Sequence, residues 1–466
     1  MKTKHLPFLL SVIALFLGII SPSLLSDGMF SDGVLYALIS NNLANDIGSF
    51  WDLHATNTLY PHFNEHPPLV FGIQSMFFYL FGDSILVERI YSLSTFFITG
   101  AIIIKIWREI SESSTSSLFW LPLLLWVTIP LVTWSATNNM LENTMMIFVS
   151  LSVFFCLKSL RNYRFLNITI AGILLLFGFL SKGFVALFPF SLFLWYYIFT
   201  RKVSFSRAII DSLFYLVATI IPLFIIFIIN PQSIDSLINY FNRQILGSLN
   251  NIQTVDNRYY ILLKTFTELF PAIIIALIIF IIAIKQKLNK SKKMFLVFLF
   301  LSLSGVVPIM ISMKQSGFYV LATFPFFSIA IALFIVSQVN YLIGKINSTN
   351  IGFKIFRNIS YLLIIASVVL VLMQINEVGR DEDKIADINL VIQIVPAEST
   401  IYVQPNLWTD WAVHGYFYRY ANISLDDKKQ FKYKFVLVDK GYKDKALVKY
   451  NKIPIELSLF DLYKKK

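Results

Sequence analysis

Long apolar runs joined by short polar connections dominate the first three quarters of this chain. Each run approaches the roughly 20 residues that a helix needs to cross a bilayer. With the N-terminus inside, the pattern predicts spans at about 6–25, 84–107, 118–133, 139–157, 165–180, 183–200, 208–229, 259–284, 294–312, 317–337 and 359–375. The sequence therefore predicts a polytopic α-helical membrane protein with about 11 transmembrane helices.

Two segments depart from this pattern. The apolar stretch 67–82 does not fit a complete further crossing, so we expect a juxtamembrane or re-entrant helix, or the first part of a long broken one. From about residue 376 the charge is mixed, and β-like runs at 400–404 and 435–439 alternate with a helix-like stretch at 410–420. We expect a transmembrane domain over 1–375, whose first outer loop is 26–66, and a small soluble α/β domain over 376–466.

Composition and charge narrow the class of protein. With 56% hydrophobic and only 14% charged residues, a water-soluble domain is excluded. A net charge of +12 would suit nucleic-acid binding, but residues 377–466 hold 15 basic and 13 acidic side chains, so the excess lies in the membrane part. It gathers in short loops: Lys105 and Arg108; Lys158, Arg161 and Arg164; Arg201, Lys202 and Arg207; 285–293; and Lys345, Lys354 and Arg357. Basic loops of this kind are cytoplasmic, and they predict no nucleic-acid partner.

The N-terminal run follows Lys2 and Lys4, as in a secretory signal peptide. Residues 21–26 form no convincing small-residue cleavage site, so we expect a retained signal anchor. The single cysteine, Cys156, lies in an apolar run and predicts neither a disulfide framework nor a cysteine metal cluster.

Ionisable residues from distant parts of the sequence fall on the outer side of this topology. They are Asp32, Glu65, His66, Glu142, Lys182, Arg243, Arg258 and Lys314. Desolvating such groups at the membrane edge is costly, so their convergence indicates a site. The alternatives are structural: a cap for Asp32, a local hydrogen bond for His66, a buried ion pair for Glu142, and interfacial snorkelling for the lysines. Asp27, in the near-duplicate Ser-Asp-Gly, is interpreted as structural.

Sequence motifs give these residues a context. The run HPPLVFGIQSMFFYLFGDSILVERIYSL at 66–93 places His before Pro-Pro-Leu, then Leu-Phe-Gly, then a helix containing Arg89. It resembles the bacterial membrane glycosyltransferases of the GT-C superfamily that are related to the protein O-mannosyltransferases and the lipid A aminoarabinose transferases. SDGVLYALISNNLA, NNMLENTMMIF, FLSKGFVALFPF, NRYYILLKTFTELFP and KQSGFYVLATFPF extend the resemblance over about 1–340. The Trp-Trp-Asp signature of oligosaccharyl transferases is absent, which argues against that branch.

The resemblance implies a GT-C fold and inverting transfer of a sugar, hexosyl or pentosyl, from a polyprenyl-phosphate donor in the bacterial inner membrane. The acceptor would be a hydroxyl of a lipid, glycan or protein on the extracytoplasmic face, where the C-terminal domain would also lie. The resemblance also implies that Asp32 is the catalytic base and that Glu142 is an acceptor-binding group or second carboxylate. The expected donor-binding and phosphate-binding residues are Tyr36, Tyr60, His62, Glu65, His66, Lys182, Arg243, Arg258, Lys314 and Tyr319.

The chemistry of these groups fits that role. A carboxylate can accept the proton of an attacking hydroxyl, and cations can stabilise the charge of a departing phosphate. Pro67 and Pro68 fit the start of a helix, which aims Glu65 and His66 at the site. The sequence requires no cofactor and leaves a divalent metal ion on Asp32 and Glu142 open. The alternative function is a transporter or flippase of lipid-linked sugars, although the chain shows neither paired halves nor a polar midplane path. A polysaccharide polymerase or ligase is a third interpretation.

Overall fold

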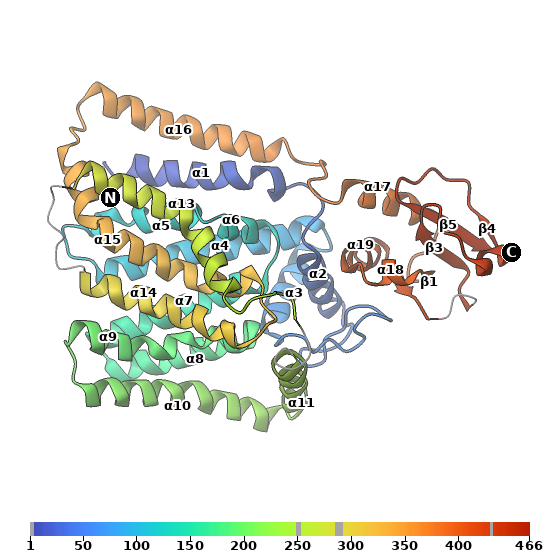
Figure 1. The fold of residues 1–466 in the computed structure, drawn as a ribbon, viewed down its shortest axis with the longest axis horizontal. Coiled ribbons are helices and arrows are strands. Elements are labelled where there is room, and N and C mark those ends of the chain that lie inside the picture. The colour runs from blue at the N-terminus through green and yellow to red at the C-terminus, as the bar shows by residue number, and fades with distance from the viewer. Residues whose placement is uncertain (1–3, 248–252, 285–291, 429–431) are drawn as a thin grey trace.

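A bundle of long helices with a small sheet beyond one end makes up the molecule (Figure 1). The computed structural model describes residues 4–247, 253–284, 292–428 and 432–466. The long helices are α1 (Leu6–Leu24), α4 (Ile85–Ile110), α7 (Leu141–Ser159), α8 (Arg164–Lys182), α10 (Phe205–Ile229), α13 (Tyr260–Ile282), α14 (Lys292–Val306), α15 (Phe324–Lys345) and α16 (Ile351–Leu372). The predicted polytopic helical fold is therefore present.

The number of crossings differs from the expected eleven. Over the described ranges, nine helices are long and apolar enough to cross a membrane, or ten if one bent pair counts as a span. That pair is the expected span 118–133, which consists of η1 (Ser116–Leu118), α5 (Trp120–Val127) and α6 (Pro130–Thr137) and bends by 80°. The residue before a proline is disfavoured in the helical conformation, and Ile129 is indeed extended.

The expected span 183–200 is also broken. Gly183, with a φ of 85°, ends α8, and the chain continues through η2 (Phe184–Ala186) and η3 (Phe188–Ser191) into the nine-residue helix α9 (Leu192–Thr200). At about 1.5 Å per residue, α9 is too short to cross a bilayer by itself. The missing eleventh span is thus a chain of short apolar turns.

Exposed apolar side chains cover the outer helices of the bundle. Examples are Ile228 and Leu213 on α10, Ile281 on α13, and Leu362 and Ile365 on α16. A large apolar surface of this kind indicates contact with lipid rather than water. A large cluster of buried aromatic and aliphatic residues, which includes Phe16, Trp107, Trp126 and Phe326, fills much of the interior.

The two ends of the bundle differ in charge. The N-terminus and the turns α9–α10 and α15–α16 lie at the end away from the sheet (Figure 1). Those turns carry Arg201, Lys202 and Lys345, as the positive-inside rule predicts for one side of a membrane. Most of the basic segment 285–293 lies outside the described residues, because only Lys292 and Lys293 of it are described.

Short helices cross the opposite end of the bundle. They are α2 (Ser31–Ala44), α3 (Leu69–Phe81), α11 (Gln232–Tyr240) and the π-helical turn η4 (Phe241–Leu246). The expected helix in 67–82 is confirmed as α3, which begins one residue after Pro68 and is too short to span a bilayer. Two irregular segments, η5 (Val307–Ile311) and η6 (Gly317–Thr323), complete this end.

The C-terminal region forms the expected small α/β unit. Its helical segments are α17 (Glu382–Val391), α18 (Pro405–Trp408), α19 (Trp411–Ala421) and η8 (Lys445–Lys449); its strands are β1 (Thr400–Val403), β2 (Ser424–Asp426), β3 (Phe435–Asp439), β4 (Tyr450–Lys452) and β5 (Phe460–Lys465). The strand order is β2-β1-β3-β5-β4, with β1 parallel to both neighbours and β5 antiparallel to β3 and β4. Helix α19 packs on α2, where a Cβ added to Gly415 would lie 2.7 Å from Val34 Cγ1. The sheet unit is therefore joined to the helix that carries Asp32.

Candidate active site

Asp32 lies in the first turn of α2, whose other residues are almost all buried. An acidic side chain is favourable at a helix N-terminus because the unpaired amide groups there carry partial positive charge. The start of the helix is fixed by Phe30, whose N–H donates to Asn138 Oδ1 at 2.8 Å. Gly33 is required by close packing, since a Cβ there would lie 2.1 Å from the Asn138 carbonyl oxygen. The turn between α6 and α7 thus holds one part of the segment that carries Asp32.

Lys182 lies at the centre of a buried polar cluster. Its Nζ is 3.1 Å from Glu142 Oε1, 3.3 Å from His66 Nε2 and 3.4 Å from the Tyr36 hydroxyl. Lys182 is 6% exposed and Glu142 is fully buried, so each neutralises a charge that would otherwise be costly to bury. The sequence had left Glu142 open between a structural ion pair and a substrate-binding role; the structure shows the ion pair.

His66 is placed in the cluster but differs from the expected cation. Burial, followed by the charges of Lys182 and Lys314, lowers the pKa of His66 well below its ordinary value, so the ring is neutral at neutral pH. Nε2 accepts from Lys182, which leaves the proton on Nδ1. Within the described ranges Nδ1 is buried without a hydrogen-bond partner.

The Asp32 carboxyl faces the same cations. Burial raises its pKa above the ordinary value, while the ammonium of Lys182, the Tyr36 hydroxyl and the ammonium of Lys314 act in the opposite direction. Burial and the nearby carboxylates of Asp32 and Glu142 raise the pKa of Tyr36 well above its usual range, so Tyr36 keeps its proton. The site therefore joins a partly desolvated carboxylate to protonated donors.

A second chain of contacts runs along the rim of the site. Lys314 Nζ donates to Gln244 Oε1 at 2.8 Å, and the Gln244 amide donates to Glu65. Arg243 Nη1 lies 3.6 Å from Glu65 Oε1. Burial lowers the pKa of Lys314, but Glu65 raises it. Glu65 thus contacts Arg243 directly and Lys314 through Gln244.

A cavity of about 580 Å³ connects these groups to the interior of the bundle. Its polar lining includes His66, Lys182, Gln244, Lys314 and Tyr319. The rest of the wall is mainly apolar and comes from η2, η3 and η5 with their neighbours: Phe184, Val185, Leu187, Phe188, Pro308, Ile309 and Ile311. The cavity is therefore cationic on one side and apolar on the other.

Two predicted residues lie elsewhere. His62 Nδ1 pairs with Asp52 Oδ1 at 2.8 Å, and its side chain is 71% exposed on the outer loop. Arg258 is exposed and donates to the Ile311 carbonyl oxygen at 3.0 Å. Arg258 was selected by its side of the membrane, which cannot distinguish a side chain that points outward from one that points inward.

Tyr60 has an intermediate position. Its ring packs edge-on against Phe63 and against Trp411 of α19. Burial and the charge of Glu65 raise the pKa of Tyr60 to about 12. It therefore joins the rim of the site to the C-terminal unit and keeps its proton at neutral pH.

Sequence reasoning missed two members of the site. Gln244 bridges Glu65 and Lys314, and Tyr240 closes the cavity beside Gly183. A Cβ at Gly183 would lie 1.7 Å from the Tyr240 hydroxyl oxygen, so the tyrosine depends on that glycine. Gln244 directly follows the predicted Arg243, but an amide in a polar loop carries no distinctive signal.

A divalent ion on Asp32 and Glu142 stays a prediction. Across the described ranges, no group of three or more His, Cys, Asp and Glu side chains could hold a metal ion. Glu142 is instead paired with Lys182.

Fold and site together define a polytopic membrane protein with the GT-C fold, and comparisons with known proteins confirm the predicted resemblance. Residues 65–229 match the model of the dolichyl-phosphate-mannose-protein mannosyltransferase family. The match begins at Glu65 and His66 and includes Glu142 and Lys182. No curated protein matches the chain.

Solved structures show the same fold at low sequence identity. ArnT from Cupriavidus metallidurans bound to undecaprenyl phosphate is 13% identical, with a TM-score of 0.68 over 98% of this chain and 97% of that one. Its apo form is 15% identical, with a TM-score of 0.66 over 97% and 96%. The apo oligosaccharyltransferase of Archaeoglobus fulgidus is 12% identical, with a TM-score of 0.56 over 94% of this chain and 70% of that one. The chain is thus similar to ArnT in fold over nearly its whole length.

Proposed function

We propose that this protein is an inverting glycosyltransferase that moves a hexosyl or pentosyl group from a polyprenyl-phosphate donor to a hydroxyl acceptor. One observation carries the proposal: the cations Lys182 and Lys314 lie at one side of an otherwise apolar cavity, and both act on the Asp32 carboxylate. A lipid phosphate has the same division of charge and apolar surface. In the ArnT structure of similar fold, the bound molecule is undecaprenyl phosphate.

The donor would bind with its phosphate at the polar side of the cavity. Lys182 and Lys314 line the cavity and can donate to phosphate oxygens, and charge-assisted hydrogen bonds of this type are strong. The apolar wall formed by η2, η3 and η5 would cover the first isoprene units. The sugar would then lie towards Asp32 and Tyr36.

The reaction forms one C–O bond and breaks another. The acceptor oxygen attacks the anomeric carbon from the face opposite the phosphate, and its proton passes to the Asp32 carboxylate. The bond from that carbon to the phosphate oxygen breaks, and the phosphate keeps the electron pair. General-base catalysis supplies roughly 10²–10⁴-fold. Lys182 and Lys314 stabilise the charge that the leaving phosphate gains, and inversion follows from the opposite-face attack.

The membrane topology supports an extracytoplasmic site in the bacterial inner membrane. The basic turns of the bundle lie at the end away from Asp32 and the sheet unit. With those turns in the cytoplasm, the cavity and residues 376–466 face outward. The acceptor would then be a lipid, a glycan or a protein that reaches this face.

A matched pair of aspartate variants tests the proposal. Asp32→Asn should abolish transfer from a radiolabelled polyprenyl-phosphate sugar to acceptors in isolated membranes at unchanged protein abundance. Asp46→Asn, an exposed residue of the same outer loop, should transfer at the wild-type rate. Full transfer by Asp32→Asn would reject the assignment.

Two further experiments test the flippase alternative and the metal alternative. A flippase would still translocate a fluorescent lipid-linked sugar in vesicles when Asp32 is replaced, whereas a transferase would form no product. Repeating the transfer assay with a chelator tests the metal alternative, because the step proposed above uses no metal ion and should be unaffected.

A further inference from the structure

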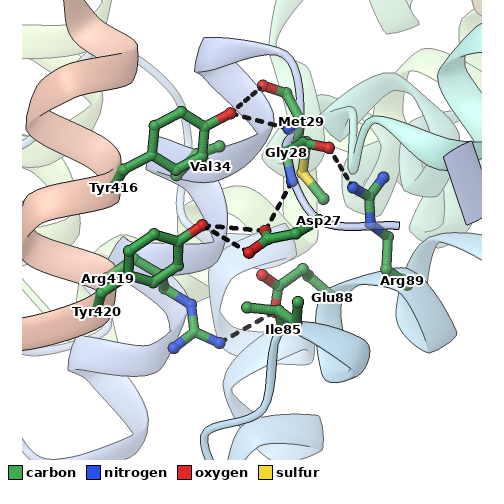
Figure 2. Close-up of a pocket in the computed structure, with 10 residues that line it drawn as sticks. All are labelled: Asp27, Gly28, Met29, Val34, Ile85, Glu88, Arg89, Tyr416, Arg419 and Tyr420. Carbon is green, nitrogen blue, oxygen red and sulfur yellow. Dashed lines mark hydrogen bonds and ion pairs between the residues drawn. The ribbon is translucent and has the colours of Figure 1, made fainter. Parts of the chain in front are cut away.

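The turn at residues 26–30, which leads into the helix of Asp32, is held from three sides, and Figure 2 shows the contacts of Arg89, Tyr416 and Tyr420. On the bundle side, the buried Arg89 of α4 donates to the carbonyl oxygens of Ser26 at 3.1 Å and Gly28 at 2.5 Å, and also to that of Thr137. On a second side, the Asp27 N–H donates to the Glu377 carbonyl oxygen at 2.8 Å. Arg89, a motif residue without an assigned role in the sequence, thus binds backbone rather than substrate.

The third side is the C-terminal unit. The Met29 N–H donates to the Tyr416 hydroxyl oxygen at 3.0 Å. The same hydroxyl lies 3.0 Å from the Met29 carbonyl oxygen and 3.0 Å from Asp381 Oδ2, and either can take its proton. The Tyr420 hydroxyl lies 3.0 Å from both carboxylate oxygens of Asp27. Tyrosines one turn apart on α19 therefore bind the turn directly (Figure 2).

A buried ion pair fixes α19 in this position. Arg419 Nη2 lies 3.2 Å from Glu88 Oε2 of α4, and Arg419 also pairs with Asp83. The Arg419 and Glu88 side chains are 3% and 6% exposed. Breaking such a pair on one side leaves a charge buried without compensation, which disfavours separation of α19 from the bundle. The ion pair thus holds the hydroxyl groups of Tyr416 and Tyr420 beside the turn.

From these contacts we infer that Tyr416 of the C-terminal unit is a positioning residue for sugar transfer, which sets the place of the Asp32 carboxylate through the peptide of Met29. The inference rests on the function proposed above. It gives the C-terminal unit a part in the reaction, since this unit completes the scaffold of the active site.

The physical argument concerns one peptide group. Arg89 binds the carbonyls of Ser26 and Gly28, and Asn138 accepts from the Phe30 N–H, whereas the peptide of Met29 is held by Tyr416. Without that hydroxyl the buried Met29 amide would lose its partner, and an unsatisfied buried donor favours any shift that pairs it again. Asp32 is three residues further on, and a displacement of about 1 Å at a reacting group can cost about 10²-fold in rate.

Tyr416→Phe removes the hydroxyl and keeps the ring. In the full-length protein we expect kcat for transfer from the labelled polyprenyl-phosphate sugar to fall by about 10-fold or more, with the donor KM within about twofold, because Lys182 and Lys314 are untouched. Hydrogen exchange measured by mass spectrometry should also become faster at residues 26–30.

Tyr450→Phe is the matched control. This buried tyrosine of β4 donates to the Tyr433 carbonyl oxygen at 3.1 Å inside the sheet unit, remote from the turn. It should keep the wild-type kcat, KM and exchange at 26–30. Thermal unfolding in detergent, measured for both variants, reports any general loss of stability.

The experiments distinguish failure of the positioning role from failure of the proposed function. If Asp32→Asn is inactive while Tyr416→Phe keeps the wild-type kcat, the positioning role is wrong and the proposed function stands. If both tyrosine variants lose activity in proportion to their thermal stability, the positioning role is likewise overturned. If Asp32→Asn is fully active, the proposed function is wrong, and the positioning role that rests on it is wrong as well.

Discussion

Two Ser-Asp-Gly tripeptides five residues apart have opposite environments. Asp27 is saturated with hydrogen bonds: Tyr420 donates to its carboxylate, and so does the Gly28 N–H at 2.6 Å. The Asp32 carboxyl is subject to the charges of Lys182 and Lys314, which line the cavity, and burial raises its pKa. The sequence interpretation of Asp27 as structural agrees with these contacts, although the tripeptide itself gives no reason for the difference.

The contrast extends to the groups around each aspartate. On the side of the 26–30 turn, Arg89, Tyr416 and Tyr420 bind backbone or carboxylate atoms of the protein. Beside Asp32, the Nδ1 of His66 lacks a partner among the described residues. Saturated polar groups stabilise a fold, whereas unsaturated ones retain the capacity to bind a ligand. We therefore expect substitutions on the two sides to affect different properties.

The largest effect is expected for the aspartates themselves. Asp32→Asn should lower transfer by roughly 10²–10⁴-fold with little loss of stability, since it removes a base and also a buried charge. Asp27→Asn weakens charged hydrogen bonds worth about 1.5–3 kcal/mol, so it should lower the thermal unfolding midpoint and reduce transfer much less. Transfer assays and thermal unfolding of both variants check this. Equal losses of activity would contradict the comparison.

Replacement of Lys182 should affect both stability and transfer, because Lys182 pairs with Glu142 and also lines the cavity. Lys182→Met leaves the Glu142 carboxylate buried and unpaired, at a cost of about 3–5 kcal/mol. The double variant Lys182→Met with Glu142→Leu should recover most of that stability and remain inactive. Denaturant unfolding in detergent and the transfer assay measure the two effects, and a double variant as unstable as the single one would show that the pair is not the cause.

A smaller effect is expected in the pH dependence of the rate. Asp32 acts as a base only when ionised, and the Lys314 ammonium lowers the pKa of Asp32. Lys314→Met should therefore raise that pKa and move the acidic limb of the kcat profile to higher pH. The control is Arg243→Met, because Arg243 pairs with Glu65 and is not among the groups that shift Asp32. A limb that moves to lower pH after loss of Lys314 would exclude Asp32 as the titrating base.

The smallest effect is expected at His62. Its exposed pair with Asp52 is of a kind worth about 0–1 kcal/mol, so His62→Ala should change neither transfer nor the unfolding midpoint measurably. His66→Ala, which removes a group from the cavity wall, should reduce transfer in the same assay. Comparable losses of transfer in the two variants would indicate that His62 also belongs to the site.

Much of the bundle could be predicted from hydrophobic runs because a membrane helix must satisfy its backbone internally and bury about 20 apolar residues. Nine expected spans correspond to α1, α4, α7, α8, α10, α13, α14 with η5, α15 with η6, and α16, which begins at Ile351 rather than at about 359. Two did not, since Pro130 and Gly183 break runs whose composition alone is continuous. Hydropathy measures composition and is insensitive to such local breaks.

The site was predicted less completely. Asp32, Tyr36, His66, Glu142, Lys182 and Lys314 converge as the resemblance implies. The neutral state of His66, the outward direction of His62 and Arg258, and the bridging role of Gln244 depend on which neighbours surround each side chain. Sequence order contains no such information.

The sequence by itself determined a polytopic helical membrane protein, the end of the bundle at which charged groups gather, and the family it resembles. These properties follow from composition, sidedness and local motifs, each of which is read along the chain. Only the tertiary structure decided that Asp27 accepts hydrogen bonds from Tyr420, whereas Asp32 is subject to the charges of Lys182 and Lys314. It also decided that α19 holds the turn before Asp32. Such differences arise because burial and hydrogen-bond partners are set by residues nearly 400 positions apart, which meet only in the folded chain.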